Sequence, residues 1–341
     1  MYIFWRQVAK LNVLLYFGKI EINGEENIPA NDAPFIYAVN HQAAFMDAVI
    51  LGTLSPFPVY YLTRSDVFKP ATKWIFSCFN MIPIYRIRDG FSKLSKNEAI
   101  FETIKDLLLQ DKRILIFPEG NHHHTHFLRP ISKGVSRIAI NSQLVNEKDI
   151  YVVPVGLNYF SHTRSSRKLI LNYGKPIRVN DFIPEDKAAG PKELNKFRIT
   201  VADAIKENLV IPEDDGDYEN KKLVFKQKNE KLSFQEIKKL ANSDKQFVEQ
   251  KNSPIANILS WVLLLPNLPV FLFYFWFEKN KIGQIAFISS IKLAFGMFVF
   301  PTWILICFIV LGLIWSWKIA LMVSAIQIFS FLIRRYFVRY T

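Results

Sequence analysis

The sequence from Pro34 to Leu54 is PFIYAVNHQAAFMDAVILGTL, and it decides the fold class. Its first seven residues form an apolar run typical of a buried strand, and residues 44–54 follow a helical pattern. The same alternation repeats outward along the chain. Further strand-like runs are KIEING, PVYYLT, MIPIYRI, RILIFPEG, YVVPVGLNY and KLILNYGKPI, and helical patterns recur near residues 70–79, 92–110 and 132–141. Strands that alternate with helices predict an α/β fold with helices packed on a sheet, ending near residue 210.

The composition indicates a chain that is part enzyme-sized domain and part membrane segment. Half of the 341 residues are hydrophobic and 15% are aromatic, which excludes a disordered or fibrous protein. Lys and Arg number 43 against 30 Asp and Glu, a net charge of +13 that suits nucleic acid or anionic lipid. The apolar segments favour membrane lipids as partners, and we expect no nucleic acid. The two cysteines offer neither a disulfide framework nor a cysteine-based metal site.

Changes in composition divide the chain into four segments. Residues 1–18 are aromatic and apolar with two basic residues, and we interpret them as an interfacial helix, with an amphipathic soluble helix as the alternative. No small-residue cleavage site follows, so we predict no signal peptide. Residues 19–210 form the predicted α/β domain. Residues 211–253 are dense in charge and predict a solvated linker, and residues 254–341 are predicted to be a membrane region.

Helix-breaking residues within the apolar segments after Pro254 indicate which of these segments can span a bilayer. Prolines and an asparagine at 266–269 split residues 255–277 into two pieces too short to cross a bilayer of about 30 Å, which favours a re-entrant hairpin. Residues 293–315 and 317–333 are long enough to span as transmembrane helices. With two crossings, the basic residues before the first span and after the last span both lie on the cytoplasmic side. With three crossings, these two groups would lie on opposite sides of the membrane. We expect two.

A histidine and an aspartate stand where the first quoted strand passes into its helix. His41 and Asp47 are six positions apart, which would place their side chains about 120° apart on a regular helix. They meet only if His41 precedes the helix. In that geometry Asp47 accepts a hydrogen bond from one imidazole nitrogen and leaves the other as a base. The alternative reading is a helix cap and a surface charge.

Three further blocks carry candidate site residues. Arg86 and Arg88 alternate with apolar residues in MIPIYRIRD and project from one side of an extended segment, where guanidinium groups bind phosphate or lipid headgroups. Glu119 follows a buried strand directly in ILIFPEGN, at a position where α/β folds bind ligands. Gly156 lies inside the strand pattern VVPVGLNY, which indicates a close approach to the backbone. Each block alone is weak evidence.

Taken together and in this order, the four blocks resemble the glycerolipid acyltransferase family of PlsC type, over roughly residues 20–180. The first is similar to the family's NH(x)4D signature, the second to the block ending in Arg, the third to FPEG(S/T) and the fourth to VPV(A/G). Two features depart from the pattern. Five residues separate His41 from Asp47 instead of the usual four, and Asn121 replaces the small hydroxyl residue. The resemblance implies a mixed sheet flanked by helices.

The resemblance also implies roles for the candidate residues. His41 is the general base for an attacking hydroxyl, and Asp47 fixes its tautomer. Arg86, Glu119 and Gly120 hold a glycerol phosphate. The remaining candidate substrate contacts are Arg88, Asn121, His123 and Lys133. No cofactor and no metal enter this mechanism, although four histidines within residues 122–126 leave a metal site as a less favoured reading.

The leading hypothesis is a membrane-bound O-acyltransferase that makes phosphatidic acid. It would transfer an acyl group from acyl-CoA or acyl carrier protein to 1-acylglycerol 3-phosphate. Two alternatives keep the chemistry and change the acceptor to glycerol 3-phosphate or to the hydroxyl of a lyso-aminolipid. A third, of another class, is a non-catalytic membrane protein that binds anionic lipid. The basic flanks favour a catalytic domain on the cytoplasmic face, and we expect a bacterial inner membrane.

Overall fold

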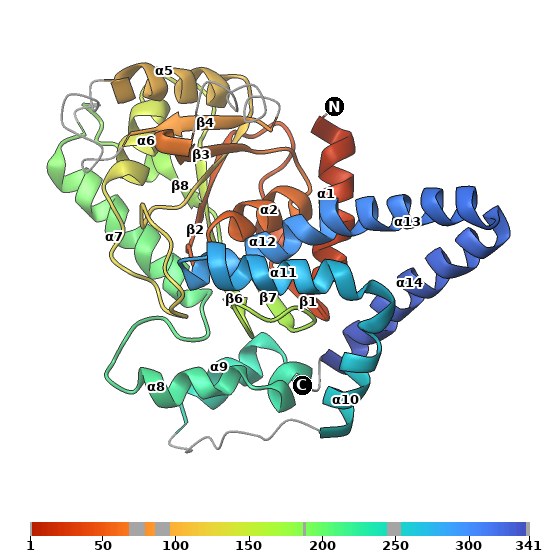
Figure 1. The fold of residues 1–341 in the computed structure, drawn as a ribbon. Helices are drawn as coiled ribbons and strands as arrows, with labels where there is room; N and C mark the ends of the chain where they lie inside the picture. Colours follow the sequence, from red (N-terminus) through yellow and green to blue (C-terminus); the bar gives the residue numbers. More distant parts are fainter. Residues whose placement is uncertain (1, 68–78, 86–95, 187–188, 244–253, 339–341) are drawn as a thin grey trace.

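Eight strands form one mixed sheet in the computed structural model, which describes residues 2–67, 79–85, 96–186, 189–243 and 254–338 (Figure 1). The strands are β1 (Lys19–Asn23), β2 (Phe35–Val39), β3 (Tyr60–Arg64), β4 (Met81–Ile84), β5 (Arg113–Ile116), β6 (Tyr151–Tyr159), β7 (Lys168–Tyr173) and β8 (Ile177–Arg178). Their order is β1-β7-β6-β2-β5-β3-β4, and β8 pairs with β6. The predicted α/β class is therefore confirmed.

The direction of the strands brings the candidate site together. β2 is central and runs parallel to β5 on one side and to β6 on the other. β6 and β7 are antiparallel, which makes the sheet mixed. The register places Ala38 beside Ile116 and Val39 beside Val155. Because parallel strands end at the same edge of a sheet, the residues after β2 and after β5 emerge side by side.

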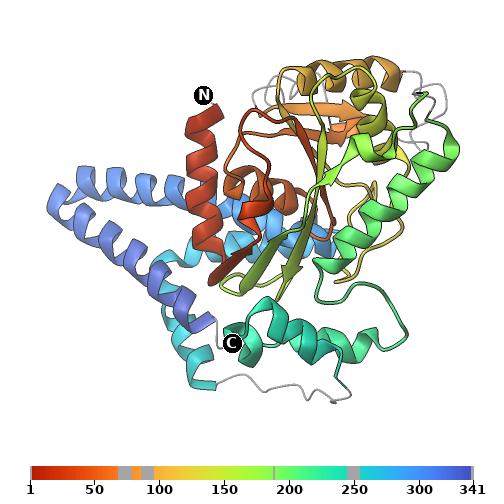
Figure 2. The ribbon, with the colours of Figure 1, turned by 180° about the vertical axis from the view of Figure 1, so that it is seen from behind.

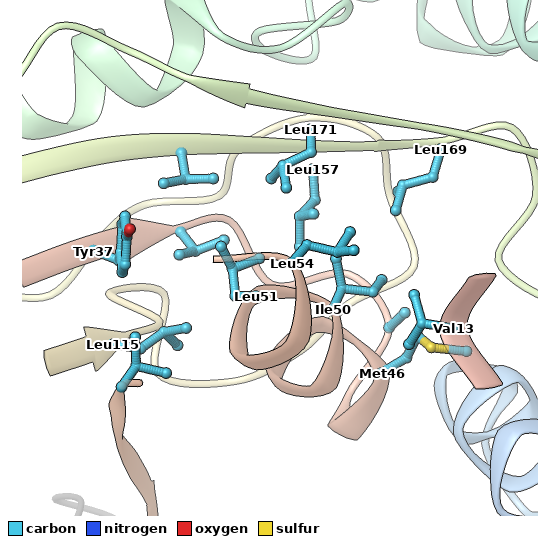
Figure 3. Packing of buried hydrophobic residues seen from close by; sticks show 14 of the residues in the cluster. Val13, Tyr37, Met46, Ile50, Leu51, Leu54, Leu115, Leu157, Leu169 and Leu171 are labelled. Atoms are coloured by element: carbon cyan, nitrogen blue, oxygen red, sulfur yellow. The ribbon is translucent and has the colours of Figure 1, made fainter. Parts of the chain in front are cut away.

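Alternating side chains of the strands fill a separate core on each face of the sheet. Tyr37 and Leu115 point to the face covered by α1 (Tyr2–Tyr16) and α2 (Phe45–Leu54), where Figure 3 shows them near Leu51 of α2. Ile36 and Ile114 point to the opposite face. That face is covered by α5 (Lys96–Leu109), α6 (Gly134–Gln143) and α7 (Pro191–Glu207). The predicted helix near residues 70–79 lies almost wholly outside the described residues.

Residues 211–253, predicted as a solvated linker, pack against the sheet over their described part. They form α8 (Tyr218–Lys221), α9 (Phe234–Ala241) and the 3-10 turns Lys222–Phe225 and Gln227–Lys231. Val224, Phe225 and Phe234 are buried in a third cluster with Phe160 and Ile170 of the α/β domain. The prediction was wrong here because a few apolar side chains at helical spacing are enough to dock a charged segment.

The C-terminal region is mostly helical over its described residues, with short breaks at residues 263–264, 282–284 and 315–316. It contains α10 (Pro254–Val262), α11 (Leu268–Lys281), α12 (Ile288–Ala294), a π-helical turn (Phe295–Val299), α13 (Phe300–Ile314) and α14 (Trp317–Val338). Two helical stretches are long and apolar enough to cross a membrane, Ile285–Ile314 and Trp317–Arg335. The pair formed by α10 and the helix after it is bent by 43° at its break. Whether that pair enters the bilayer as a hairpin stays a prediction.

The C-terminal helices both contact the α/β domain and project away from it. Figures 1 and 2 show α11 and α12 lying against the domain, whereas α13 and α14 extend beyond it as two arms of a V. No residue of α13 is buried. The π-helical turn ends two residues before Pro301, which lacks the N–H that would continue regular helical bonding.

Candidate active site

His41 precedes α2 and is held in a loop at the end of β2. The preceding residue, Asn40, is fully buried and bridges to β6: its side-chain amide donates to the Leu157 carbonyl at 3.0 Å, and the Leu157 N–H donates to its side-chain oxygen at 2.7 Å. Asn40 thus replaces the backbone pairing that β2 loses at its end. The loop leaves the strand at a fixed position.

Asp47 lies in the first turn of α2, fully buried, and its Oδ2 accepts a hydrogen bond from His41 Nδ1 at 2.7 Å. The same oxygen accepts the backbone N–H groups of Gln42 and Ala43, each at 2.8 Å. The six-residue interval is possible because Ala44 has a φ of 47°, which turns the loop back on itself before the helix begins.

Tyr159, at the end of β6, completes the environment of Asp47. Its O–H donates to Asp47 Oδ1 at 2.6 Å. Burial raises the pKa of Tyr159 well above its ordinary value, and the neighbouring Asp47 carboxylate raises it further. The phenol therefore stays protonated and acts as a donor. Buried carboxylates require such donors because each replaces water that burial removes.

The free side of the His41 ring borders an accessible space. With Nδ1 engaged by Asp47, Nε2 is the nitrogen left for substrate, and 15% of the side chain is exposed. Phe117 stacks on one face with ring centroids 4.0 Å apart. His122 meets the ring edge at 5.6 Å, and burial lowers the pKa of His122, with nearby His41 adding to the effect. The arrangement suits an oriented base.

Glu119 supports the His41 loop with both of its carboxylate oxygens. Oε1 accepts the His41 backbone N–H at 2.8 Å, and Oε2 accepts Arg129 Nε at 2.9 Å. Burial raises the pKa of Glu119, and these two donors only partly oppose that shift. We predicted a direct contact between Glu119 and the substrate phosphate. In the structure, both carboxylate oxygens of Glu119 already accept hydrogen bonds from protein groups. Gly120 has a φ of 70°, so the tight turn after Glu119 requires glycine.

The histidines of residues 122–126 point to different places instead of one centre. His123 touches the site through its backbone, whose N–H donates to the His41 carbonyl at 3.0 Å, while its exposed ring stacks on His124. The His126 ring stacks on Phe225 and lies beside the ring of His162. Within the described part of the chain, no group of three or more possible metal ligands occurs.

The remaining predicted substrate contacts either lie near the His41 loop without touching His41 or Asp47, or fall outside the described residues. The backbone carbonyl of Asn121 accepts a hydrogen bond from Arg129. Lys133 is exposed at the start of α6, and the N–H of the preceding Ser132 donates to the Pro118 carbonyl at 2.8 Å. Arg86 and Arg88 lie outside the described residues, so their placement stays a prediction.

Several residues of the site escaped the sequence analysis. Phe117 belongs to the quoted FPEG block and Tyr159 to a quoted strand pattern, but neither was assigned a role, and nor was Arg129. Two more contacts come from the C-terminal region. Gln284 Oε1 lies 3.4 Å from His122 Nε2, and Phe287 packs edge-on against the His122 ring at 4.9 Å. Residues more than 160 positions away in the sequence thus contact His122 beside the candidate site.

Ser290 of α12 connects the C-terminal region to the start of α2. Its hydroxyl donates to the Ala43 carbonyl at 3.2 Å and accepts the Met46 N–H at 3.0 Å. Ala44 stands at the N-cap of α2 and has no side chain that caps the helix. Ser290 therefore performs that function from a distant segment, beside the loop that holds Asp47.

Comparison with known proteins gives a family match around this site. A family model described as Acyltransferase matches residues 19–158, which include His41, Asp47 and Glu119. A chloroplastic 1-acyl-sn-glycerol-3-phosphate acyltransferase of Brassica napus is 29% identical over 44% of this chain and 41% of its own length. A chloroplastic enzyme of the same description from Arabidopsis thaliana is 28% identical, over 58% of this chain and 53% of its own length. The chain thus spans about half the length of these relatives.

A yeast protein and a solved structure also match. Glycerol-3-phosphate O-acyltransferase 2 of Saccharomyces cerevisiae is 33% identical over 28% of this chain and 13% of its own length. The crystal structure of the 1-acyl-sn-glycerophosphate acyltransferase PlsC from Thermotoga maritima has a TM-score of 0.41 and 18% identity, covering 60% of this chain and 76% of that one.

Proposed function

Because residues 19–158 make this chain a member of the PlsC-type glycerolipid acyltransferase family, we propose that it acylates the free hydroxyl of 1-acylglycerol 3-phosphate. The product is phosphatidic acid, and the donor is the thioester of acyl-CoA or acyl carrier protein. The names of the two plant relatives support this acceptor. The observation that carries the proposal is the 2.7 Å contact between His41 Nδ1 and Asp47, because it leaves Nε2 as an oriented base.

The reaction proceeds in two proton transfers around one tetrahedral intermediate. His41 Nε2 takes the proton of the acceptor hydroxyl while its oxygen attacks the thioester carbonyl carbon. Asp47 stabilises the imidazolium that forms. The C–S bond then breaks, and the imidazolium returns its proton to the departing thiolate. No acyl-enzyme intermediate is required. Arg86 and Arg88 are proposed to bind the acceptor phosphate, because guanidinium groups match its geometry.

The enzyme is proposed to work at a membrane surface, where its lipid acceptor and product reside. The two helices long and apolar enough to span a membrane support an integral membrane protein. Lys279 and Lys281 end α11, and Arg335 lies in the last turn of α14. Basic residues on these flanks favour a cytoplasmic catalytic domain, which we propose faces the inside of a bacterial inner membrane.

Replacing His41 tests the proposed base. We expect His41→Ala to lower kcat by about a hundredfold to ten-thousandfold, because general base catalysis contributes roughly 10²–10⁴. The measurement is thioester consumption by purified protein with lysophosphatidic acid, with the product identified by mass spectrometry. His124→Ala is the matched control, because His124 is exposed in the same stretch of histidines. Turnover retained by His41→Ala would rule out this base.

A panel of acceptors separates the proposed substrate from its alternatives. Glycerol 3-phosphate, 1-acylglycerol 3-phosphate and a phosphate-free lysolipid are each offered with acyl-CoA and with acyl carrier protein donors. We expect Arg86→Ala to raise KM for the phosphate-bearing acceptors and to leave that for the phosphate-free one unchanged. An equal loss with every acceptor would remove Arg86 from phosphate recognition.

A further inference from the structure

A cavity of about 570 Å³ lies away from His41, where α1, the loop between β6 and β7 and the C-terminal helices meet. Figures 1 and 2 both show α1 beside the C-terminal helices at this junction. Neither His41, Asp47 nor Glu119 lines the cavity. Much of its wall is apolar and aromatic, formed by residues that include Leu15, Trp261, Phe271, Phe275, Phe295 and Phe331.

The charged lining of this cavity is of one sign. Arg164, Lys292, Arg334 and Arg335 line it, and among the described lining residues there is no aspartate or glutamate. Glu278 is close enough to influence Lys292 but does not line the cavity. Several cations thus share a largely apolar cavity whose described lining residues include no carboxylate, a setting that favours binding of an anion.

Three of these cations, Lys292, Arg334 and Arg335, donate hydrogen bonds to backbone carbonyls of the described residues. Lys292 Nζ donates to the Thr163 carbonyl at 2.7 Å, and Arg334 Nε donates to the Ser260 carbonyl at 3.1 Å. Arg335 donates to the carbonyl of Phe17 at 3.0 Å. Carbonyl oxygens orient a cation but carry no net charge, so these contacts hold the side chains in place while the positive potential remains.

Hydrogen-bonding groups without a partner also line the cavity. The Tyr16 hydroxyl, the Ser166 hydroxyl and Arg335 Nε are buried, and none has a hydrogen-bond partner among the described residues. Buried donors are normally satisfied, so these groups add to the cost of burying polar side chains in the cavity wall. An anion with several acceptor oxygens would bind the cations that line the cavity.

We propose that this cavity binds one anionic phospholipid, separate from the substrates of acyl transfer. The headgroup phosphate would lie against Lys292, Arg334 and Arg335, and an acyl chain would lie along the aromatic wall. Cations alone would suit inorganic phosphate, and an apolar wall alone would suit a neutral chain. The two together in one cavity, at the base of two potential membrane spans, fit an amphiphile with a negative headgroup.

Lipid-dependent stability of the full chain tests the proposal. The protein is purified in a non-ionic detergent, delipidated and supplied with phosphatidylglycerol, phosphatidylcholine or inorganic phosphate. We expect phosphatidylglycerol to raise the melting temperature by about 3 °C, with a clearly smaller effect of phosphatidylcholine and none of phosphate. The double variant Lys292→Gln/Arg334→Gln should lose the response. Lys318→Gln, an exposed cation in α14 outside the cavity, should keep it.

A second measurement avoids changing any cation, in case the double variant fails to fold. Phosphatidylglycerol with brominated chains quenches nearby tryptophan, and Trp261 lines the cavity. We expect a saturable quenching component in the natural chain that is missing in Trp261→Phe. Equal stabilisation by phosphatidylcholine and phosphatidylglycerol, or a full response to inorganic phosphate alone, would overturn the anionic lipid as ligand. Identical quenching in Trp261→Phe would overturn the site.

Discussion

Asp47 shows how a buried carboxylate can hold a base without water. It accepts four hydrogen bonds, from His41 Nδ1, from the N–H groups of Gln42 and Ala43, and from the Tyr159 hydroxyl. These donors come from one loop and one strand end, so the imidazole is fixed relative to the sheet. Glu119 fixes the same loop from the other side through the His41 N–H. The ring is therefore held both through its side chain and through its backbone.

His162 gives the stability of the domain a dependence on pH. Burial lowers its pKa to about 4, and its Nε2 lies 2.9 Å from Gln42 Oε1. The unfolded chain binds this proton near pH 6.5, so stability is complete above that pH and decreases as the pH falls towards about 4. A shift of this size corresponds to roughly 3 kcal/mol. Burial also lowers the pKa of neighbouring His126, which adds in the same direction.

Melting temperatures at pH 7.5 and pH 5 measure this effect. We expect the natural chain to lose stability at pH 5 and His162→Gln to lose less, because glutamine donates to Gln42 without titrating. The exposed His124→Gln serves as the control and should behave like the natural chain. The same loss in His162→Gln and in the natural chain would show that this imidazole does not set the pH dependence.

α2 depends on α12 for the cap that its own sequence does not supply. Ala44 cannot cap the helix, and Ser290 bonds both to the Ala43 carbonyl and to the Met46 N–H. We assign Ser290 a positioning role, because it acts on Asp47 through the first turn of α2. A similar dependence exists at His122, which contacts Gln284 and Phe287. The C-terminal region is thus part of the structure around the candidate site.

Removing the Ser290 hydroxyl should slow the reaction without unfolding the domain. A helix cap contributes about 1 kcal/mol, and we expect Ser290→Ala to lower kcat about fivefold with KM nearly unchanged. Ser290→Thr should restore most of the rate. Ser289→Ala is the matched control, because the Ser289 hydroxyl is buried and has no hydrogen-bond partner among the described residues. An equal loss in both alanine variants, or a loss confined to KM, would contradict the positioning role.

Local sequence patterns predicted the helices and strands, but they did not predict the contacts between residues far apart in the sequence. The strand and helix patterns follow periodicity, and Gly156 indicated a close approach correctly: a Cβ there would lie 2.1 Å from the Asn208 carbonyl oxygen. The dyad followed from the loop argument. Arg129 and Ser290 could not be predicted, because a single arginine or a serine in an apolar segment carries no periodic signal. Packing of residues 211–243 depends on a few apolar side chains whose partners lie far away in the sequence.

The C-terminal helices combine a contact with the α/β domain and a large apolar surface. α12 lies against α2, while α13 and α14 project outward with exposed leucine, isoleucine and tryptophan side chains. In water such a surface would drive association, and in a bilayer it would be solvated by lipid. The contact between α12 and α2 therefore joins the candidate site to the part of the chain that could enter a membrane.

Labelling at the turn between the two spans tests the number of crossings. A cysteine replaces Ser316 in a chain with Cys78→Ser and Cys307→Ser, and intact cells are treated with an impermeant maleimide. Two crossings predict that position 316 is labelled from outside, because the turn then lies opposite the catalytic domain. Glu147→Cys, exposed on that domain, should be labelled only after permeabilisation. Labelling of position 316 only after permeabilisation would support three crossings.

The hydrogen bonds from Ser290 have a consequence for the order of events during synthesis. The ribosome makes residues 40–47 first and must add more than two hundred others before Ser290 exists. A nascent chain that has folded its sheet still lacks the cap of α2 and part of the wall beside His122. The contacts of the candidate site are therefore completed late, when the start of the first potential membrane span has also been made.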